Sequence, residues 1–244
     1  MAQTNYTPII VTVLVVIGVL AAVWLLVGKI PSTGENTISA TGNAEMSVMP
    51  DEAVVYLLVE TRAISAEKAK DDNARISDDV LTALIKIGID RKDIETQNFN
   101  IYPEYDWTDG KQTLKGYVAS NSMKVTSKDF NNVGKIVDAA VDKGALVNSI
   151  DFELSNDKSN EYKTQILAKA SQDAKTKAGA IAAGLGKKLG KLVSVSSSDY
   201  NYAPYPMFAR SDMAGTAEAK VAATNLQPQN LDITATVSVS YAIG

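Results

Sequence analysis

The sequence of 244 residues contains no cysteine and no histidine. The absence of cysteine excludes a disulfide framework, a thiolate nucleophile and a thiolate metal ligand. The absence of histidine removes the most common general base and metal ligand. The sequence also has no Ser/His/Asp set and no dinucleotide fingerprint, so we predict no catalytic, cofactor-binding or metal residues and no enzymatic activity. A formal net charge of −4 argues against a nucleic-acid partner.

Charged residues are also absent from residues 9–28, where the side chains are apolar apart from Thr12. The length of this run matches the roughly 20 residues that a helix needs to cross a bilayer core. The leader, residues 1–8, has no Lys or Arg, and no Ala-x-Ala cleavage site follows the run, which favours a retained signal anchor over a cleaved signal peptide. We therefore predict one transmembrane helix, whose partner is the lipid bilayer.

Behind this run, residues 29–36 are predicted to be a linker and residues 37–244 a polar domain large enough to bury its own core. Charge does not settle the side of the membrane on which that domain lies. Lys29 is the only basic residue near the run and would weakly favour a cytoplasmic C-terminal side.

Strict alternation of apolar and polar residues, the period of a half-buried strand, marks residues 37–48 and 231–243. Further β-rich runs predict strands at 53–61, 94–105, 113–126, 150–154 and 192–197. Asp109-Gly110 indicates a hairpin with a loop of more than two residues. Pro103 makes its first strand an edge or bent strand.

Apolar residues at steps of three, four and seven predict three helices. Ser65 is predicted to cap the first and Ser127 the second, which end near Gly88 and Gly144. The third, residues 157–185, has an alanine-rich stripe that lets its partner surface approach closely: Tyr162, Ile166, Ala170, Ala174, Ala178, Ile181 and Leu185. The order β-β-α-β-β-α-β-α-β-β favours an α+β fold, with helices packed on mostly antiparallel sheets.

The pattern stops between residues 198 and 230, where we predict a long loop rich in Tyr, Pro and Ala. A loop of this length without structure of its own is usually functional or disordered. Tyrosines beside prolines form adhesive contact surfaces, and the candidate partner-binding residues are Tyr200, Tyr202, Tyr205 and Phe208. The alternative is a mobile loop with a few aromatic side chains folded onto the domain.

The carboxylate pairs favour structural roles. Asp71-Asp72 and Asp78-Asp79 lie on the polar side of a helix, where a solvated face is expected. Asp51-Glu52 lies in a tight turn after Pro50, where Asp commonly bonds nearby backbone. A hydrolase that uses Asp51 or Glu52 is therefore the least favoured hypothesis.

Lysines make the third helix and its exit basic. An exposed helix face explains them better than an acidic partner or an anionic lipid surface, because acidic residues are interspersed. The lysines are Lys163, Lys169, Lys175, Lys177, Lys187, Lys188 and Lys191.

Short blocks in order along the chain carry a family resemblance: ISATGNA at 38–44 with PDEA at 50–53, GYVASN at 116–121, VGKIVDAAV at 133–141, IDF at 150–152 and DAKTKA at 173–178. Together they resemble the SIMPL-domain family, the group of the periplasmic immunogenic protein and the oxidative-stress defence proteins. The resemblance implies an α+β domain outside the cytoplasmic membrane, and so places the C-terminal domain on the extracytoplasmic side. It also implies assembly into ring-like or channel-like oligomers, and it supplies no catalytic residues.

Two functions follow as hypotheses. The first is a non-enzymatic protein, anchored in the cell membrane with its SIMPL-like domain outside, which acts as a homo-oligomer in cell-envelope integrity or stress tolerance. The second is a module that binds an extracellular ligand or an envelope protein partner through the Tyr-rich loop.

Overall fold

The structure is a computed structural model that describes residues 36–108, 110–197, 201–202, 205–208 and 228–244. The described residues form three α-helices and nine β-strands, with one short 3-10 turn, η1 (Arg91–Asp93). In chain order they are β1 (Thr37–Val48), β2 (Glu52–Ala63), α2 (Ala66–Lys86), β3 (Ile94–Thr108), β4 (Lys111–Ser127), α3 (Asn132–Val141), β5 (Leu146–Glu153), α4 (Asn156–Gly184), β6 (Leu189–Ser197), β7 (Asn201–Tyr202), β8 (Tyr205–Phe208) and β9 (Leu231–Ile243).

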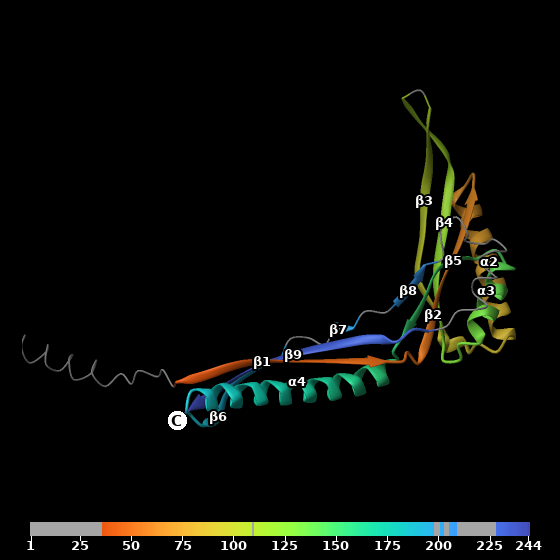
Figure 1. Cartoon of the computed structure of the whole chain (residues 1–244). Helices are drawn as coiled ribbons and strands as arrows, with labels where there is room; N and C mark the ends of the chain where they lie inside the picture. The colour runs from red at the N-terminus through yellow and green to blue at the C-terminus, as the bar shows by residue number, and fades with distance from the viewer. Residues whose placement is uncertain (1–35, 109, 198–200, 203–204, 209–227) are drawn as a thin grey trace, which may run out of the picture.

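The elements form two units that meet at an angle and give the molecule the shape of an L (Figure 1). The arm is a sheet in the order β1-β9-β6, with β7 also paired to β9, and α4 lies along it. The body is a sheet in the order β3-β4-β2-β5-β8. Helices α2 and α3 cover the face of the body sheet that is turned away from the arm (Figure 1).

The arm is held together by close contact between α4 and the strands β1 and β9. Strand β1 pairs with β9 along its whole length, from Thr37 opposite Ala242 to Val48 opposite Leu231. Helix α4 buries a line of side chains at steps of four, alanine at every position but the first, which matches the predicted alanine-rich stripe in its middle: Ile166, Ala170, Ala174, Ala178 and Ala182. Small residues on the helix let its axis lie close to the sheet.

The body has a separate core between its sheet and the two helices. Alternate residues of β2, such as Val55 and Leu57, point into it, because side chains on a strand alternate between faces. Phe152 of β5 is fully buried and meets Phe130 edge to face, with ring centroids 5.4 Å apart. An edge-to-face pair adds stability beyond the buried area of the two rings.

The α+β class and the antiparallel sheets are confirmed for the described residues, and so is the predicted order of elements from β1 to β6. None of the helices in that part of the chain is long and apolar enough to span a membrane. The predicted transmembrane helix, residues 9–28, lies outside the described residues, so it stays a prediction.

Four local predictions were wrong. Ser127 does not cap α3, because its hydroxyl donates to the carbonyl of Asp129 and accepts from the same residue's N–H. The β3–β4 loop has only two residues, since Thr108 already pairs with Lys111. The stretch 198–230 contains two short strands, β7 and β8. The end of the α4 stripe departs from the prediction, because Ile181 and Leu185 are exposed and Ala182 is buried in their place.

Candidate functional site

Five ionisable side chains gather on the face of the body sheet that faces the inside of the L. Glu52 lies directly opposite Glu153 across β2 and β5, and Tyr56 lies opposite Lys124 across β2 and β4. Asp151 is two residues before Glu153 and shares its face. The neighbouring residues on these strands belong to the core under the helices, so this acidic cluster is on the opposite face.

Burial dominates the electrostatics of the acidic cluster. Burial raises the pKa of Glu153. The charge of Lys124 lowers this pKa, and the charges of Asp151 and Glu52 raise it. Burial raises the pKa of Asp151 and of Glu52 as well. The pKa of the Tyr56 hydroxyl is raised first by burial and then by the charges of Glu153 and Asp151. The folded protein therefore favours the protonated carboxyls here more than free solution does.

This cluster can hold a proton and pair with a cation, and Ser149 of β5 lies opposite Tyr56 on the same face. Asp151 Oδ1 is buried and has no hydrogen-bond partner among the described residues. Within the same residues, no group of three or more carboxylates is arranged to hold a metal ion. The cluster could not be predicted from the sequence, because Glu52 and Glu153 meet only through the pairing of β2 with β5.

Replacing Glu153 by Gln is expected to stabilise the protein at pH 7. The raised pKa means that ionised Glu153 costs stability, and this cost disappears below the ordinary value of 4.5, where the acid is neutral in both states. Relief of the like-charge pair with Glu52 should contribute on the order of 0.5 kcal/mol. Urea unfolding of the variant and the parent from pH 4 to pH 8 should show a gain that shrinks as the pH falls.

The matched control for this measurement is Asp78→Asn, which removes an exposed carboxylate from α2. Its effect on the free energy of unfolding should stay near zero over the same pH range. A stability difference for Glu153→Gln that does not change with pH would contradict the assignment of a raised pKa to Glu153.

Asp51 has a structural role at the junction of arm and body. Ser155 donates its backbone N–H to Asp51 Oδ1 and its hydroxyl to Asp51 Oδ2, both at 2.7 Å. The Asp51 N–H donates to the Glu153 carbonyl at 3.1 Å. Ser155 Oγ also accepts from the Lys158 N–H and so caps α4. Asp51 thus joins the β1–β2 connection to the β5–α4 connection, and both of its carboxylate oxygens accept hydrogen bonds.

Glu52, the second residue of the hydrolase hypothesis, also borders a groove of about 550 Å³. The charged side chains around this groove have mixed signs: Asp90, Lys92, Asp93, Lys128 and Asp129. A groove lined in this way lacks the apolar wall that normally accompanies a catalytic or ligand pocket. The hydrolase hypothesis therefore gains no support from Glu52.

The Tyr-rich segment is divided between the two units. Tyr200 lies outside the described residues. Tyr202 belongs to β7, which pairs with β9 in the arm, whereas Tyr205 and Phe208 belong to β8, which pairs with β5 at the outer edge of the body sheet. The structure thus brings Tyr205 and Phe208 into one strand and places Tyr202 on the other unit. Their role in binding a partner stays a prediction.

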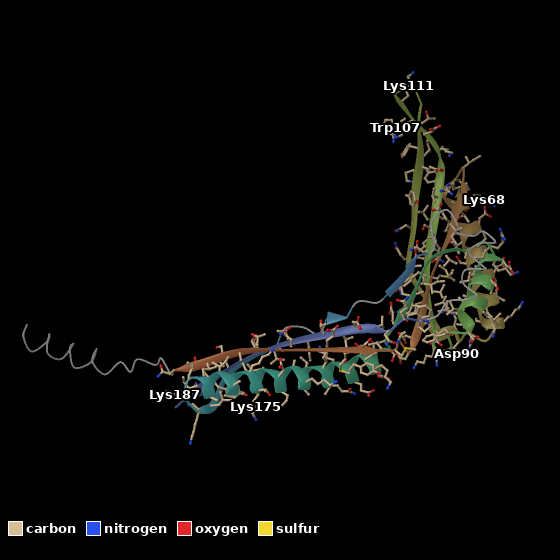
Figure 2. All side chains as sticks on the ribbon, viewed as in Figure 1. Lys68, Asp90, Trp107, Lys111, Lys175 and Lys187 are labelled. Atoms are coloured by element: carbon tan, nitrogen blue, oxygen red, sulfur yellow. The ribbon has the colours of Figure 1, made fainter. Side chains whose placement is uncertain are left out.

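The β3–β4 hairpin carries the largest uncovered apolar side chains of the described residues. It extends beyond the start of α2, away from the arm, and Figure 2 shows Trp107 close to its tip. Trp107 is 68% exposed, and exposure is shared by the alternate β3 residues Phe99, Ile101 and Tyr105 and by Leu114 of β4. Alternate residues of a strand lie on one face, and these apolar side chains define the hairpin face.

The hairpin face continues the helix-covered face of the body sheet. Phe99 pairs with Asn121 and Ile101 with Ala119. The side-chain amide of Asn121 donates to the Ser77 hydroxyl of α2 at 2.9 Å, so this face of the strands is the one that points toward α2. Past the first turn of α2, no helix of the described residues lies above the same face (Figure 1). An apolar strand face that extends beyond the helix covering it is typical of an interaction surface.

The free edge of β1 is less available for pairing, because α4 reaches round to it. Asp173 accepts the outward backbone N–H of Asn43 at 2.9 Å, and Lys177 donates to the carbonyl of Thr41 at 3.3 Å. Asp173 and Lys177 also form an ion pair, and the pKa of Asp173 is lowered, first by the hydrogen bond from Lys177 and then by that from Asn43. Side chains that cap an edge strand oppose its pairing with another chain.

Comparison with known proteins gives a consistent set of relatives. The family described as "SIMPL: Protein of unknown function (DUF541)" matches residues 38–241. The 26 kDa periplasmic immunogenic protein of Brucella melitensis biotype 1 is 35% identical over 179 residues, which cover 70% of this chain and 69% of the relative. The uncharacterized protein YggE of Escherichia coli K12 is 31% identical over 170 residues, with the same coverage. YggE of Edwardsiella ictaluri is 28% identical over 205 residues and covers 84% of this chain and 85% of the relative.

Proposed function

The chain belongs to the SIMPL family, as its sequence blocks predicted, and on that premise we propose that it is an extracytoplasmic protein, anchored in the cell membrane, that works by assembling with copies of itself. In this proposal it performs no enzymatic reaction and supports the cell envelope or its tolerance of stress. The name of the Brucella relative, a periplasmic protein, supports the location. The absence of cysteine and histidine from the sequence supports a role without catalysis.

The observation that carries self-assembly is the uncovered hairpin face. Tyr105, Trp107 and Leu114 expose an apolar surface that continues along β3 through the exposed side chains of Ile101 and Phe99. Two sheets commonly bury such faces against one another at a separation of about 10 Å. An apolar face is also complementary to a second copy of itself, as a two-fold interface requires. The capped edge of β1 directs association away from the arm and toward the hairpin.

The anchor is supported by the sequence and by the position of β1. Residues 9–28 have the length and composition of a membrane span. Residues 29–36 lead from that run to β1, whose first residue lies at the free end of the arm, far from the body (Figure 1). The body and its hairpin would then be held away from the bilayer by the length of the arm.

The test of self-assembly is the mass of the full chain in detergent. The parent should have a mass that is a multiple of 26.0 kDa, measured by sedimentation equilibrium over a wide concentration range. The double variant Tyr105→Ser, Trp107→Ser should shift toward one chain, because truncating buried aromatic anchors commonly costs about 2 kcal/mol or more each.

A control separates the hairpin face from general loss of exposed apolar surface. Ile85 of α2 is about as exposed as Tyr105 but lies away from the hairpin, so Ile85→Ser should leave the mass unchanged. A parent that stays a single chain at the highest concentration would rule out self-assembly.

The second candidate function, binding of another molecule through the Tyr-rich segment, is favoured by the position of β8. This strand, Tyr205–Phe208, forms an outer edge of the body sheet, and edge strands can accept an added strand from a partner. The mass measurement separates the two functions. In this second case the parent is a single chain and the hairpin variant changes nothing.

A further inference from the structure

The free end of the arm brings a lysine-rich turn close to Asn36, the residue directly before β1. The N–H of Ile243 donates to the carbonyl of Asn36 at 2.9 Å. On the other side of β9, Lys188 exchanges backbone hydrogen bonds with Gly244, at 3.1 and 3.3 Å. The turn that contains Lys187 and Lys188 is therefore separated from Asn36 only by β9, and neighbouring strands lie about 5 Å apart.

Positive charge dominates this half of the arm. From residue 174 to residue 198 the sequence has five lysines and no acidic residue, although Asp173 and Asp199 flank the stretch. The neighbouring parts of β1, residues 37–42, and β9, residues 237–243, have no charged residue at all. Figure 2 shows Lys187 at the end of the arm and Lys175 along α4. Both side chains are exposed, as is Lys188.

Large apolar side chains are exposed in the same place. Leu185, directly after α4, is 64% exposed, and Leu192 of β6 is 49% exposed. Ile181 and Val193 are exposed to a similar extent. A solvated helix face would carry polar side chains at these positions. Lysines mixed with exposed leucine, isoleucine and valine are typical of a surface that lies in the headgroup region of a membrane.

The chain geometry keeps this surface near the bilayer. Eight residues, 29–36, connect the end of the apolar run to β1, and fully extended they span about 28 Å. Helix α4 has 29 residues and is about 43 Å long. The end of the arm that carries Lys187 is thus the only end that the linker can hold close to the membrane surface, whereas the body lies at the far end.

We infer that the free end of the arm docks on the bilayer through an arm-tip surface made of Ile181, Leu185, Lys187, Lys188 and Leu192, and that its ligand is the headgroup region of anionic phospholipids. Lysines contribute attraction to anionic headgroups, and the apolar side chains insert at the boundary with the acyl chains. This inference rests on the proposed anchor, which keeps the arm tip at the membrane. Docking fixes the direction of the arm, and therefore the position of the hairpin, relative to the bilayer.

The test uses the absence of cysteine from the chain, which allows a single fluorescent label on the full-length protein. Leu185→Cys places the label in the arm-tip surface, and Ile85→Cys places a control label on α2 of the body, away from the hairpin face. The proteins are reconstituted into vesicles of phosphatidylcholine with or without phosphatidylglycerol, and quenching by nitroxide-labelled lipid is measured. We expect strong quenching at position 185 only with phosphatidylglycerol, and none at position 85.

Charge reversal provides the second arm of the experiment. In the Leu185→Cys protein, Lys187→Glu with Lys188→Glu should lower the ratio of docked to undocked molecules at least about tenfold, since each lysine near an anionic surface contributes about a factor of five. The matched control is Lys135→Glu with Lys143→Glu, two exposed lysines of the body, which should change nothing. Raising the salt concentration should weaken quenching in the parent.

Flotation of the vesicles separates the outcomes. If the chain floats with both kinds of vesicle but position 185 is not quenched, the anchor stands and the docking inference is wrong. If the chain floats only with phosphatidylglycerol and is quenched, docking stands and the anchor is wrong. Flotation with neither overturns both. The label at position 185 can also be shielded from aqueous iodide while quenching by lipid is absent. If the sample then consists of assemblies of more than one chain, a second copy covers the arm tip, and docking on the bilayer is overturned.

Discussion

Gly42→Ala is expected to lower the free energy of unfolding by about 3 kcal/mol or more. A Cβ atom placed on Gly42 would lie within 3 Å of three backbone atoms of α4, from Ala170 and Ala174; the farthest of them, Ala174 Cα, would be 2.8 Å away. The backbone of a helix cannot rotate aside as a side chain can. Helix α4 would have to move off the β1–β9 sheet and lose contacts along its buried line.

Two further variants make this prediction specific. Gly179→Ala adds the same methyl group within α4, but nothing lies within 4 Å of its Cβ, so it should stabilise by about 0.5 to 1 kcal/mol. Adding Ala174→Gly to Gly42→Ala should not restore stability, because the clash is with backbone atoms. Urea unfolding followed by circular dichroism measures all three, and a loss below about 0.5 kcal/mol for Gly42→Ala would refute the close approach.

The elements of the arm are the ones that the sequence predicts best. Strands β1 and β9 begin and end at the predicted residues, because one face of each packs on α4 and the alternation is uninterrupted. Helix α4 was predicted to within one residue at each end. The end of its stripe was wrong because the sheet does not cover Ile181 and Leu185 there. A helical period shows which side chains share a face, but not how far the partner sheet extends.

The remaining errors concern features that depend on pairing between distant segments. Strands β7 and β8 have two and four residues, too few to produce a period in the sequence. The acidic cluster depends on the register that places Glu52 opposite Glu153, and register cannot be read from either strand alone. Residues 106–108 and 111–112 are mostly polar. The sequence therefore has no alternating apolar pattern there, although β3 and β4 pair as far as the tip of the hairpin.

The two proposed interaction surfaces lie at opposite ends of the L. The hairpin face is in the body, and the arm-tip surface is at the far end of α4 (Figure 2). Self-association through one would therefore leave the other accessible. Asp51 and Ser155 lie between them at the junction. In the proposed arrangement, the angle between arm and body would set how far the hairpin stands from the membrane.

Asn73 was also missed, although it occupies a position of the apolar stripe on α2, four residues after Ala69. It is fully buried, and its side-chain amide donates to the carbonyls of Val59 in β2 and Ala119 in β4, both at 2.9 Å. Its Oδ1 accepts from Ser77 at 3.3 Å. A polar side chain at a stripe position is the signal that could have revealed it, because a buried amide is retained only where its hydrogen bonds are satisfied.

Asn73→Leu is expected to lower the free energy of unfolding by about 3 kcal/mol, because two buried carbonyls each lose a donor and leucine offers none. Asn73→Asp should be worse at pH 7, since an ionised carboxylate would face two carbonyl oxygens. Its pKa should therefore be raised, so part of the lost stability returns as the pH falls and the acid gains a proton that it can donate. Asn160→Leu, at an exposed site on α4, is the matched control and should change stability by less than about 0.5 kcal/mol. If Asn73→Asp loses equal stability at pH 4 and pH 7, the two carbonyls do not govern this site. If stability recovers in acid, the stabilising contact is made by the amide N–H groups of Asn73, which join α2 to both strands.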